Sequence, residues 1–179
     1  MQNIKTHHWC QKYNLDYNLE EVIAFFREKM ELTPFMSHKD YAVLAKKSRY
    51  WDWLTGDIQN PHIINLLNHI AEKHHLPLNT KNTKIALWEY GEGDELEPHI
   101  DVNISLSSAI VIALVGSFET RLFDSEDTSK IVDQVIYGPG EYIILNNTAY
   151  YHGGRPLDGY RLAAVAFVDP SFDMTNFWS

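Results

Sequence analysis

Residues 87–101 read Leu-Trp-Glu-Tyr-Gly-Glu-Gly-Asp-Glu-Leu-Glu-Pro-His-Ile-Asp. The stretch has the pattern of a strand end, an acidic loop containing glycines, and then His99 and Asp101 two positions apart. Residues i and i+2 of an extended backbone project to the same face, so the imidazole and the carboxylate should point at a common spot. The pair would supply two of the three protein ligands of a facial metal site.

The third ligand is expected to be a histidine far along the chain, on a segment that returns beside the first. His152 fits, because it follows a strand-like run at 141–145 and precedes Gly153-Gly154. Two histidines and one carboxylate leave positions open on an octahedral ion, which is the pattern of non-haem Fe(II) oxygenases. We therefore predict that His99, Asp101 and His152 bind the metal and form the catalytic centre.

The chain resembles a known family, the Fe(II)- and 2-oxoglutarate-dependent oxygenases of the prolyl-hydroxylase-like kind. The resemblance covers roughly residues 84–170 and rests on four motifs in the expected order. They are Tyr90 to Gly93, His99-Ile100-Asp101, Gly138-Pro139-Gly140-Glu141 leading into a strand, and His152 followed nine residues later by Arg161.

The resemblance implies that Fe(II), 2-oxoglutarate and O2 take part in the reaction, with ascorbate as a stimulatory reductant. It also implies that Arg161 binds the distal carboxylate of 2-oxoglutarate, since a guanidinium can pair with a carboxylate through two hydrogen bonds. Members of the family usually carry Ser or Thr two residues after this arginine, where this chain has Ala163. Tyr90 is our candidate for the missing hydroxyl donor.

The reaction implied by the resemblance is hydroxylation of a C–H bond with release of succinate and CO2; desaturation and ring formation stay open. The substrate would be a small molecule, an amino acid or a residue in a peptide. Two alternatives remain: a cupin-like metalloenzyme that does not use 2-oxoglutarate, and a non-catalytic β-barrel binding module. Arg161 argues against the first, and tight Fe(II) binding would argue against the second.

The pattern of apolar residues changes near Lys84, from helical to strand-like spacing. Residues 1–80 are expected to be mainly helical, with one helix starting at Asn18, a second at 39–47 and a third from Asn60-Pro61 to about His75. The expected strands follow turn residues and cover 84–90, 107–115, 118–123, 131–137, 141–145 and 160–168. This order predicts an α+β fold, in which N-terminal helices pack on a double-stranded β-helix (a jelly roll, cupin-like) at 84–170. We expect residues 1–179 to form a single oxygenase domain.

The composition excludes some classes of protein. With 179 residues, 45% hydrophobic and 13% aromatic, the chain is long and apolar enough to fold around a core. The net charge of -9 argues against nucleic acid as a partner, because that partner needs a basic surface. The single cysteine, Cys10, suits a reducing compartment, and we find neither a secretory signal nor a membrane-spanning run. We therefore expect a cytoplasmic protein.

Overall fold

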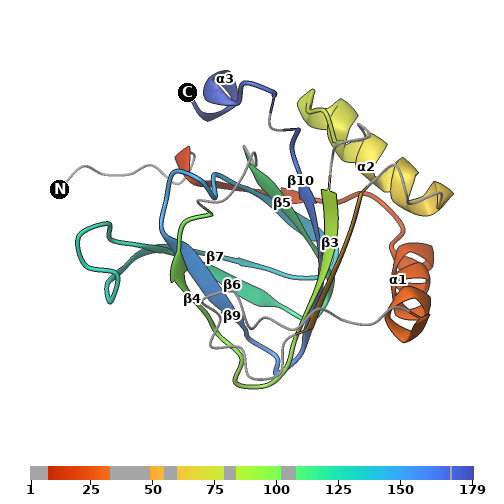
Figure 1. Cartoon of the computed structure of the whole chain (residues 1–179), viewed down its shortest axis with the longest axis horizontal. Helices are drawn as coiled ribbons and strands as arrows, with labels where there is room; N and C mark the ends of the chain where they lie inside the picture. The colour runs from red at the N-terminus through yellow and green to blue at the C-terminus, as the bar shows by residue number, and fades with distance from the viewer. Residues whose placement is uncertain (1–7, 33–48, 55–59, 79–83, 102–107, 170) are drawn as a thin grey trace.

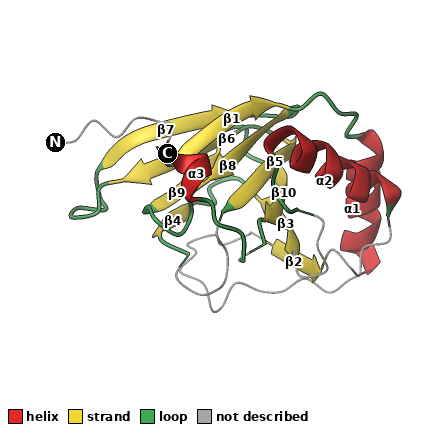
Figure 2. Cartoon of the chain, turned by 90° about the horizontal axis from the view of Figure 1, so that it is seen from above, coloured by secondary structure: helices red, strands yellow, loops and turns green. Residues whose placement is uncertain are grey.

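The structure is a computed structural model that describes residues 8–32, 49–54, 60–78, 84–101, 108–169 and 171–179. Within these residues the strands form two antiparallel sheets that face each other, and two helices cover the outer side of the larger sheet (Figure 1, Figure 2). This is the predicted α+β arrangement of helices packed on a jelly roll. No helix in the described ranges is both long and apolar enough to cross a membrane.

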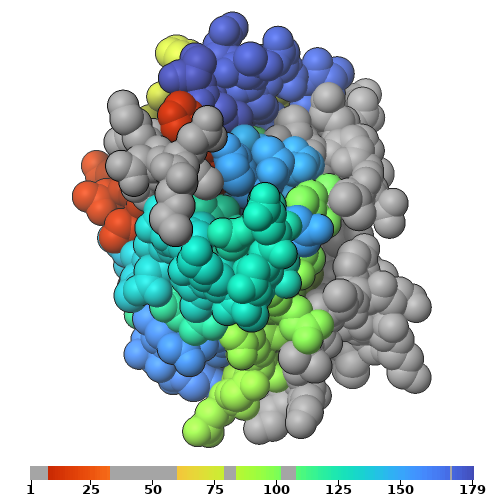
Figure 3. Space-filling view, turned by 90° about the vertical axis from the view of Figure 1, so that its left-hand side faces the viewer, coloured from red at the N-terminus to blue at the C-terminus, as the bar shows by residue number. Residues whose placement is uncertain are grey.

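The larger sheet has six strands in the order β1-β8-β5-β10-β3-β2, and the smaller sheet has four in the order β4-β9-β6-β7. The six strands are β1 (Cys10–Asn14), β2 (Arg49–Leu54), β3 (Lys84–Tyr90), β5 (Ala109–Val115), β8 (Glu141–Leu145) and β10 (Arg161–Phe167). The four are β4 (Leu96–His99), β6 (Phe118–Phe123), β7 (Ile131–Tyr137) and β9 (His152–Pro156). The hairpin of β6 and β7 occupies the middle of the face in Figure 3, and the C-terminal segment with the short α3 (Thr175–Trp178) lies above it.

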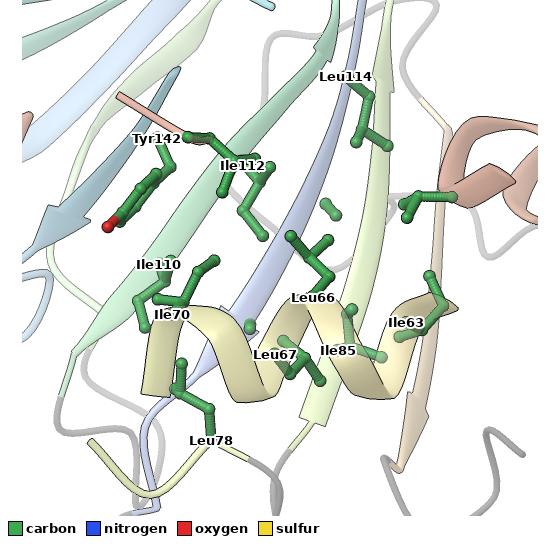
Figure 4. Close-up of a cluster of buried hydrophobic side chains, with 14 of the residues drawn as sticks. Ile63, Leu66, Leu67, Ile70, Leu78, Ile85, Ile110, Ile112, Leu114 and Tyr142 are labelled. Carbon is green, nitrogen blue, oxygen red and sulfur yellow. The ribbon is translucent and has the colours of Figure 1, made fainter. Parts of the chain in front are cut away.

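The helices α1 (Glu20–Leu32) and α2 (Pro61–His74) pack against the larger sheet through an apolar layer. The side chains of α2 that point at the strands lie in the layer drawn in Figure 4 and are fully or almost fully buried: Ile63, Leu66, Leu67 and Ile70. Burying one such side chain contributes about 1.5–3 kcal/mol, so this face of α2 holds the helix on the sheet. Truncating Leu66 to Ala would cost about 2–5 kcal/mol.

The ends of α2 follow from its sequence. The side chain of Asn60 accepts hydrogen bonds from the backbone N–H groups of His62 (2.9 Å) and Ile63 (3.3 Å). Pro61, which follows this cap, needs no hydrogen-bond acceptor in the first turn. At the other end, His75 adopts the left-handed conformation with φ 56° and ends the helix. The predicted helix from Asn60-Pro61 to His75 is confirmed.

The N-terminal half contains strands that the sequence did not indicate. Cys10–Asn14 forms β1 and pairs with β8, and Arg49–Leu54 forms β2 and pairs with β3. Segments of five and six residues are too short for their apolar spacing to distinguish a strand from a helix. The expectation of a mainly helical first half is therefore wrong for these two strands. The helix expected at 39–47 lies outside the described residues.

Small side chains on the inner face of the larger sheet leave space between the two sheets. Four alanines project there from three strands: Ala86, Ala109, Ala113 and Ala163. A cavity of about 90 Å³ lies in this layer and is lined by residues of both sheets. The fold thus places a largely apolar chamber between the sheets.

Candidate metal centre

Three side chains that could bind a metal meet at this cavity. His99 is the last residue of β4, His152 is the first residue of β9, and Asp101 lies two positions beyond β4. One ligand atom from each lies within 4.8 Å of the others. The Nε2 atoms of His99 and His152 are 3.4 Å and 3.9 Å from the Asp101 carboxylate oxygens. The structure therefore brings together the three residues that the sequence predicted.

Asp101 reaches this position differently from the prediction. Its backbone is not part of β4, which ends at His99, and its N–H instead donates to the carbonyl of Asn147 at 3.0 Å. Asn147 belongs to the loop after β8, so this bond ties the residue after the strand to the opposite sheet. The convergence of His99 and Asp101 depends on this loop as well as on strand alternation.

The backbone fixes the orientation of both imidazole rings. The Nδ1 atom of His99 lies 2.7 Å from the carbonyl of Glu97, and Nδ1 of His152 lies 3.0 Å from the carbonyl of Tyr150. A carbonyl oxygen can only accept, so Nδ1 carries the proton in each ring and Nε2 keeps its lone pair. Such bonds orient histidines that bind a metal through Nε2.

Burial sets the protonation of the three groups. It lowers the pKa of His152 to about 4, and the neighbouring His99 adds to that effect. Burial raises the pKa of Asp101, but the nearby imidazoles of His99 and His152 and the bond from Asn147 outweigh it and lower that pKa overall. Burial lowers the pKa of His99, but the Asp101 carboxylate beside it and its bond to the Glu97 carbonyl raise it overall. At neutral pH the site therefore offers a neutral His152 and an ionised Asp101.

A β-bulge in β4 aims His99 into the cavity. Leu96 stands opposite Gly154 and His99 opposite His152, so β4 uses one residue more than β9 over the same distance. Leu96 and His99 are three positions apart, yet both line the cavity. Pro98 lies within the bulge, where its missing N–H removes no regular ladder bond.

Strand β9 carries His152 and was not among the strands expected from the sequence. The two glycines allow neighbouring strands to come close. A Cβ on Gly153 would lie 2.4 Å from the Leu96 carbonyl oxygen, and one on Gly154 would lie 2.1 Å from the Glu119 carbonyl oxygen. Both distances are too short for any other residue type.

Arg161 lies in the same cavity and is 3% exposed. Its guanidinium carbon is 3.5 Å from the ring centre of Phe118, and its Nη2 donates to the Tyr137 hydroxyl at 2.8 Å. Its Nε is buried and has no hydrogen-bond partner among the residues that the structure describes. In the described part of the chain Arg161 forms no ion pair, so its charge has no acidic partner there.

Two acids that lie near Arg161 in the sequence bond other groups. Asp158 accepts from the backbone N–H of Ser117 at 3.0 Å, and Asp169 accepts from Ser171. A buried charge without a counter-ion is costly. The position therefore suits a bound anion, such as a carboxylate.

Hydroxyl groups surround Arg161, and the sequence indicated only one of them. Tyr90 stands opposite Arg161 in the β3–β10 ladder, with its ring centre 5.4 Å from the guanidinium carbon. Tyr137 bonds Arg161 directly and lies 3.2 Å from the Thr120 hydroxyl. Burial raises the pKa of both tyrosines, so their hydroxyls stay protonated and can donate. Thr120 and Tyr137 lie on β6 and β7 and face the cavity. Strand alternation in the sequence does not reveal that they lie near Arg161, which is on the other sheet.

The residues present fit a divalent metal and a dicarboxylate. Two imidazole nitrogens and one carboxylate form a donor set suited to Fe(II), and the cavity that they line also reaches Arg161. The walls between them are apolar and include Val111, Leu145 and Val165. An elongated anion with one end at the metal and the other at Arg161 would satisfy both.

No family model and no curated protein matches this chain, but many solved structures do. A prolyl-4-hydroxylase from Pseudomonas putida is 12% identical, with 90% of this chain and 92% of that chain covered and a TM-score of 0.63. A prolyl hydroxylase from Trichoplax adhaerens, in complex with a peptide fragment of hypoxia inducible factor, is 12% identical (91% and 84% covered, TM-score 0.64). HygX from Streptomyces hygroscopicus, with nickel and 2-oxoglutarate bound, is 14% identical (93% and 85% covered, TM-score 0.60).

Identities this low show the fold alone. They agree with the resemblance seen in the sequence, which rested on motifs, whereas these matches rest on the path of the backbone. The chain has the fold of the prolyl hydroxylases and other 2-oxoglutarate- and Fe(II)-dependent oxygenases.

Proposed function

We propose that this protein is an Fe(II)- and 2-oxoglutarate-dependent oxygenase that hydroxylates a C–H bond, with His99, Asp101 and His152 as the ligands of the metal. The observation that carries the proposal is the buried Arg161, which has no acidic partner among the described residues and shares a cavity with the three ligands. A non-catalytic barrel has no need for a cation there, and neither has a cupin-like enzyme that does without 2-oxoglutarate.

In this proposal Arg161 binds the distal carboxylate of 2-oxoglutarate through its unpartnered Nε and its Nη groups. Tyr137 accepts a hydrogen bond from Arg161, so the proton of its own hydroxyl is left to donate to Thr120 or to the carboxylate. Tyr90, whose ring faces the same guanidinium, is the second donor candidate. Together these hydroxyls replace the Ser or Thr that the family carries where this chain has Ala163.

The metal side of the cavity would work through the three ligands. His99 and His152 keep their Nε2 lone pairs because each Nδ1 donates to a carbonyl, and Asp101 supplies a negative charge. Bound Fe(II) would supply the activation of O2, with 2-oxoglutarate converted to succinate and CO2 as a C–H bond is oxidised. The apolar walls exclude water from the space between the metal site and Arg161.

The substrate remains a class in this proposal: a small molecule, an amino acid or a residue in a peptide. The peptide bound to the Trichoplax prolyl hydroxylase supports a peptide as one candidate. The net charge of -9 supports a substrate other than nucleic acid, and we propose a cytoplasmic location from the single cysteine.

The test is succinate formation by the purified chain with Fe(II), 2-oxoglutarate and ascorbate, first alone and then with amino acids and peptides. The wild type should form succinate slowly alone and faster with its substrate. His152→Ala should form none, and Arg161→Met, which keeps the length of the side chain, should lose on the order of 100-fold in turnover at low 2-oxoglutarate. Absence of succinate in the wild type under all conditions would contradict the proposal.

A further inference from the structure

Asn147 holds Asp101 through two hydrogen bonds. It lies in the loop after β8 and is completely buried. Its side-chain Nδ2 donates to Oδ2 of Asp101 at 2.5 Å, and its backbone carbonyl accepts from the Asp101 N–H at 3.0 Å. One residue thus fixes both the backbone and the carboxylate of Asp101.

The amide oxygen of Asn147 has no hydrogen-bond partner in the described part of the chain. An ionised carboxylate only accepts hydrogen bonds, so the NH₂ group must be the one that faces Asp101. The other end, Oδ1, is buried and accepts no hydrogen bond from any residue in the described ranges. Burying an unsatisfied acceptor costs free energy that an apolar side chain would avoid. Stability therefore does not explain an asparagine here, whereas its bond to Asp101 does.

The two oxygens of Asp101 have different surroundings. Oδ1 lies 3.4 Å from Nε2 of His99. Oδ2 accepts the bond from Asn147 and lies farther from an imidazole, at 3.9 Å from Nε2 of His152. The amide therefore occupies one carboxylate oxygen and leaves the other directed at His99.

We propose that Asn147 is a positioning residue that makes Asp101 bind the metal through Oδ1 alone. This inference rests on the proposed function, because it takes His99, Asp101 and His152 as ligands. A carboxylate that bound through both oxygens would occupy a further coordination position, one that the cosubstrate or O2 needs. By engaging Oδ2, Asn147 keeps that position open, and it orients the carboxylate before the metal arrives.

The experiment measures metal binding to the full chain without turnover. The metal-free protein is titrated with Co(II), and the affinity is recorded by calorimetry together with the visible absorption spectrum, which depends on the number and type of ligands. Asn147→Asp keeps the shape but removes the donor, and Asn147→Ala removes the whole amide. Asn146→Ala is the matched control, because the Asn146 amide donates to the His8 carbonyl and not to Asp101.

Both Asn147 variants should bind Co(II) at least about 10-fold more weakly, with an altered spectrum, whereas Asn146→Ala should match the wild type. Thermal unfolding of each metal-free variant checks its fold, and Asn147→Ala carries the comparison if Asn147→Asp does not fold. Wild-type affinity and spectrum in Asn147→Ala would overturn the role of Asn147 and leave the proposed function standing. Failure of the wild type to bind Co(II) would instead contradict the proposed function itself.

Discussion

His99 and His152 stand directly opposite each other on β4 and β9, with ring centroids 4.3 Å apart and ring planes 50° from parallel. Each ring donates through Nδ1 to a carbonyl two residues earlier, and each directs Nε2 toward Asp101. The cross-strand pair thus converges on one carboxylate before any metal is bound.

This convergence predicts that a divalent metal stabilises the fold. At a Co(II) concentration 100 times the dissociation constant, binding would add about 2.7 kcal/mol, which raises the unfolding temperature by about 5–10 °C for a chain of this size. His152→Ala should lose the increase because it removes one ligand. Differential scanning fluorimetry of both proteins, with and without metal, checks this. An equal increase in the variant would mean that the metal binds elsewhere.

Arg161 should lower the stability of the free protein and provide the binding site for the distal carboxylate of 2-oxoglutarate. Arg161→Met removes a buried charge without an acidic partner in the described residues, so the free protein should unfold at a temperature no lower than that of the wild type. 2-Oxoglutarate should raise the unfolding temperature of the metal-loaded wild type only. Thermal unfolding with and without 2-oxoglutarate measures both effects. A variant still stabilised by 2-oxoglutarate would show that another cation binds its distal carboxylate.

The hydroxyl of Tyr137 should contribute to that binding. Tyr137→Phe removes the acceptor of the Arg161 bond and a donor to the carboxylate, so the 2-oxoglutarate dissociation constant should rise about fivefold, the value of one net hydrogen bond. Tyr90→Phe, measured alongside by calorimetry, tests the other donor candidate. Tyr160→Phe is the control, since its exposed hydroxyl bonds Glu89 outside the cavity. If the dissociation constant of 2-oxoglutarate stayed the same in both Tyr137→Phe and Tyr90→Phe, neither tyrosine would be the donor that replaces the missing hydroxyl at Ala163.

Gly154 should tolerate no side chain. Its added Cβ would lie 2.1 Å from a backbone oxygen of β6, so Gly154→Ala must push β9 away from β6. Such overpacking costs about 1–3 kcal/mol, and the shift should also weaken metal binding through His152. Gly93→Asn is the control, because Gly93 has φ +80° with open space around it, a conformation that asparagine accepts. Chemical unfolding and Co(II) titration measure both effects, and a stable Gly154→Ala with full metal affinity would refute the packing argument.

His74 predicts how stability depends on pH. Burial lowers its pKa to about 4, with help from the charges of Lys73 and His75, and its Nε2 lies 2.6 Å from the Tyr142 hydroxyl. The unfolded chain therefore takes up this proton near the ordinary histidine pKa of about 6.5, before the folded chain does. Stability should fall as the pH decreases from about 6.5 towards 4. In denaturant unfolding between pH 7.5 and 5, His74→Gln should lose less stability than the wild type, and equal slopes would contradict this.

Strands that are bounded by turn residues could be predicted from the sequence. β6, β7 and β8 have the expected bounds, and β5 and β10 differ from them by no more than two residues at either end. Turn residues lie on both sides of these five strands, so the local sequence determines where each strand begins and ends. Strands β4 and β9 were not predicted. His152–Pro156 has two glycines and a proline, and it forms a strand because β4 and β6 pack closely on both sides of it.

The same division applies to the site. The sequence indicated His99, Asp101, His152 and Arg161 through their residue types and their order. The first three can bind a metal, and the fourth can bind a carboxylate. The sequence did not indicate Tyr137, Thr120 and Asn147, since their roles come from distances across the two sheets and from burial. A buried amide bonded to a carboxylate 46 residues away leaves no local pattern.

The extra residue in β4 has a consequence for how this site can change over time. Leu96 and His99 share a face although their separation is odd, so the bulge inverts the parity of the strand. Loss of Glu97 or Pro98 would restore the regular count, and the histidine would then lie two positions from Leu96 and still face the cavity opposite His152. The length of this short segment is therefore less constrained than the identities of the ligands. A relative one residue shorter here could lose the bulge and yet keep the fold, the motif and the metal site.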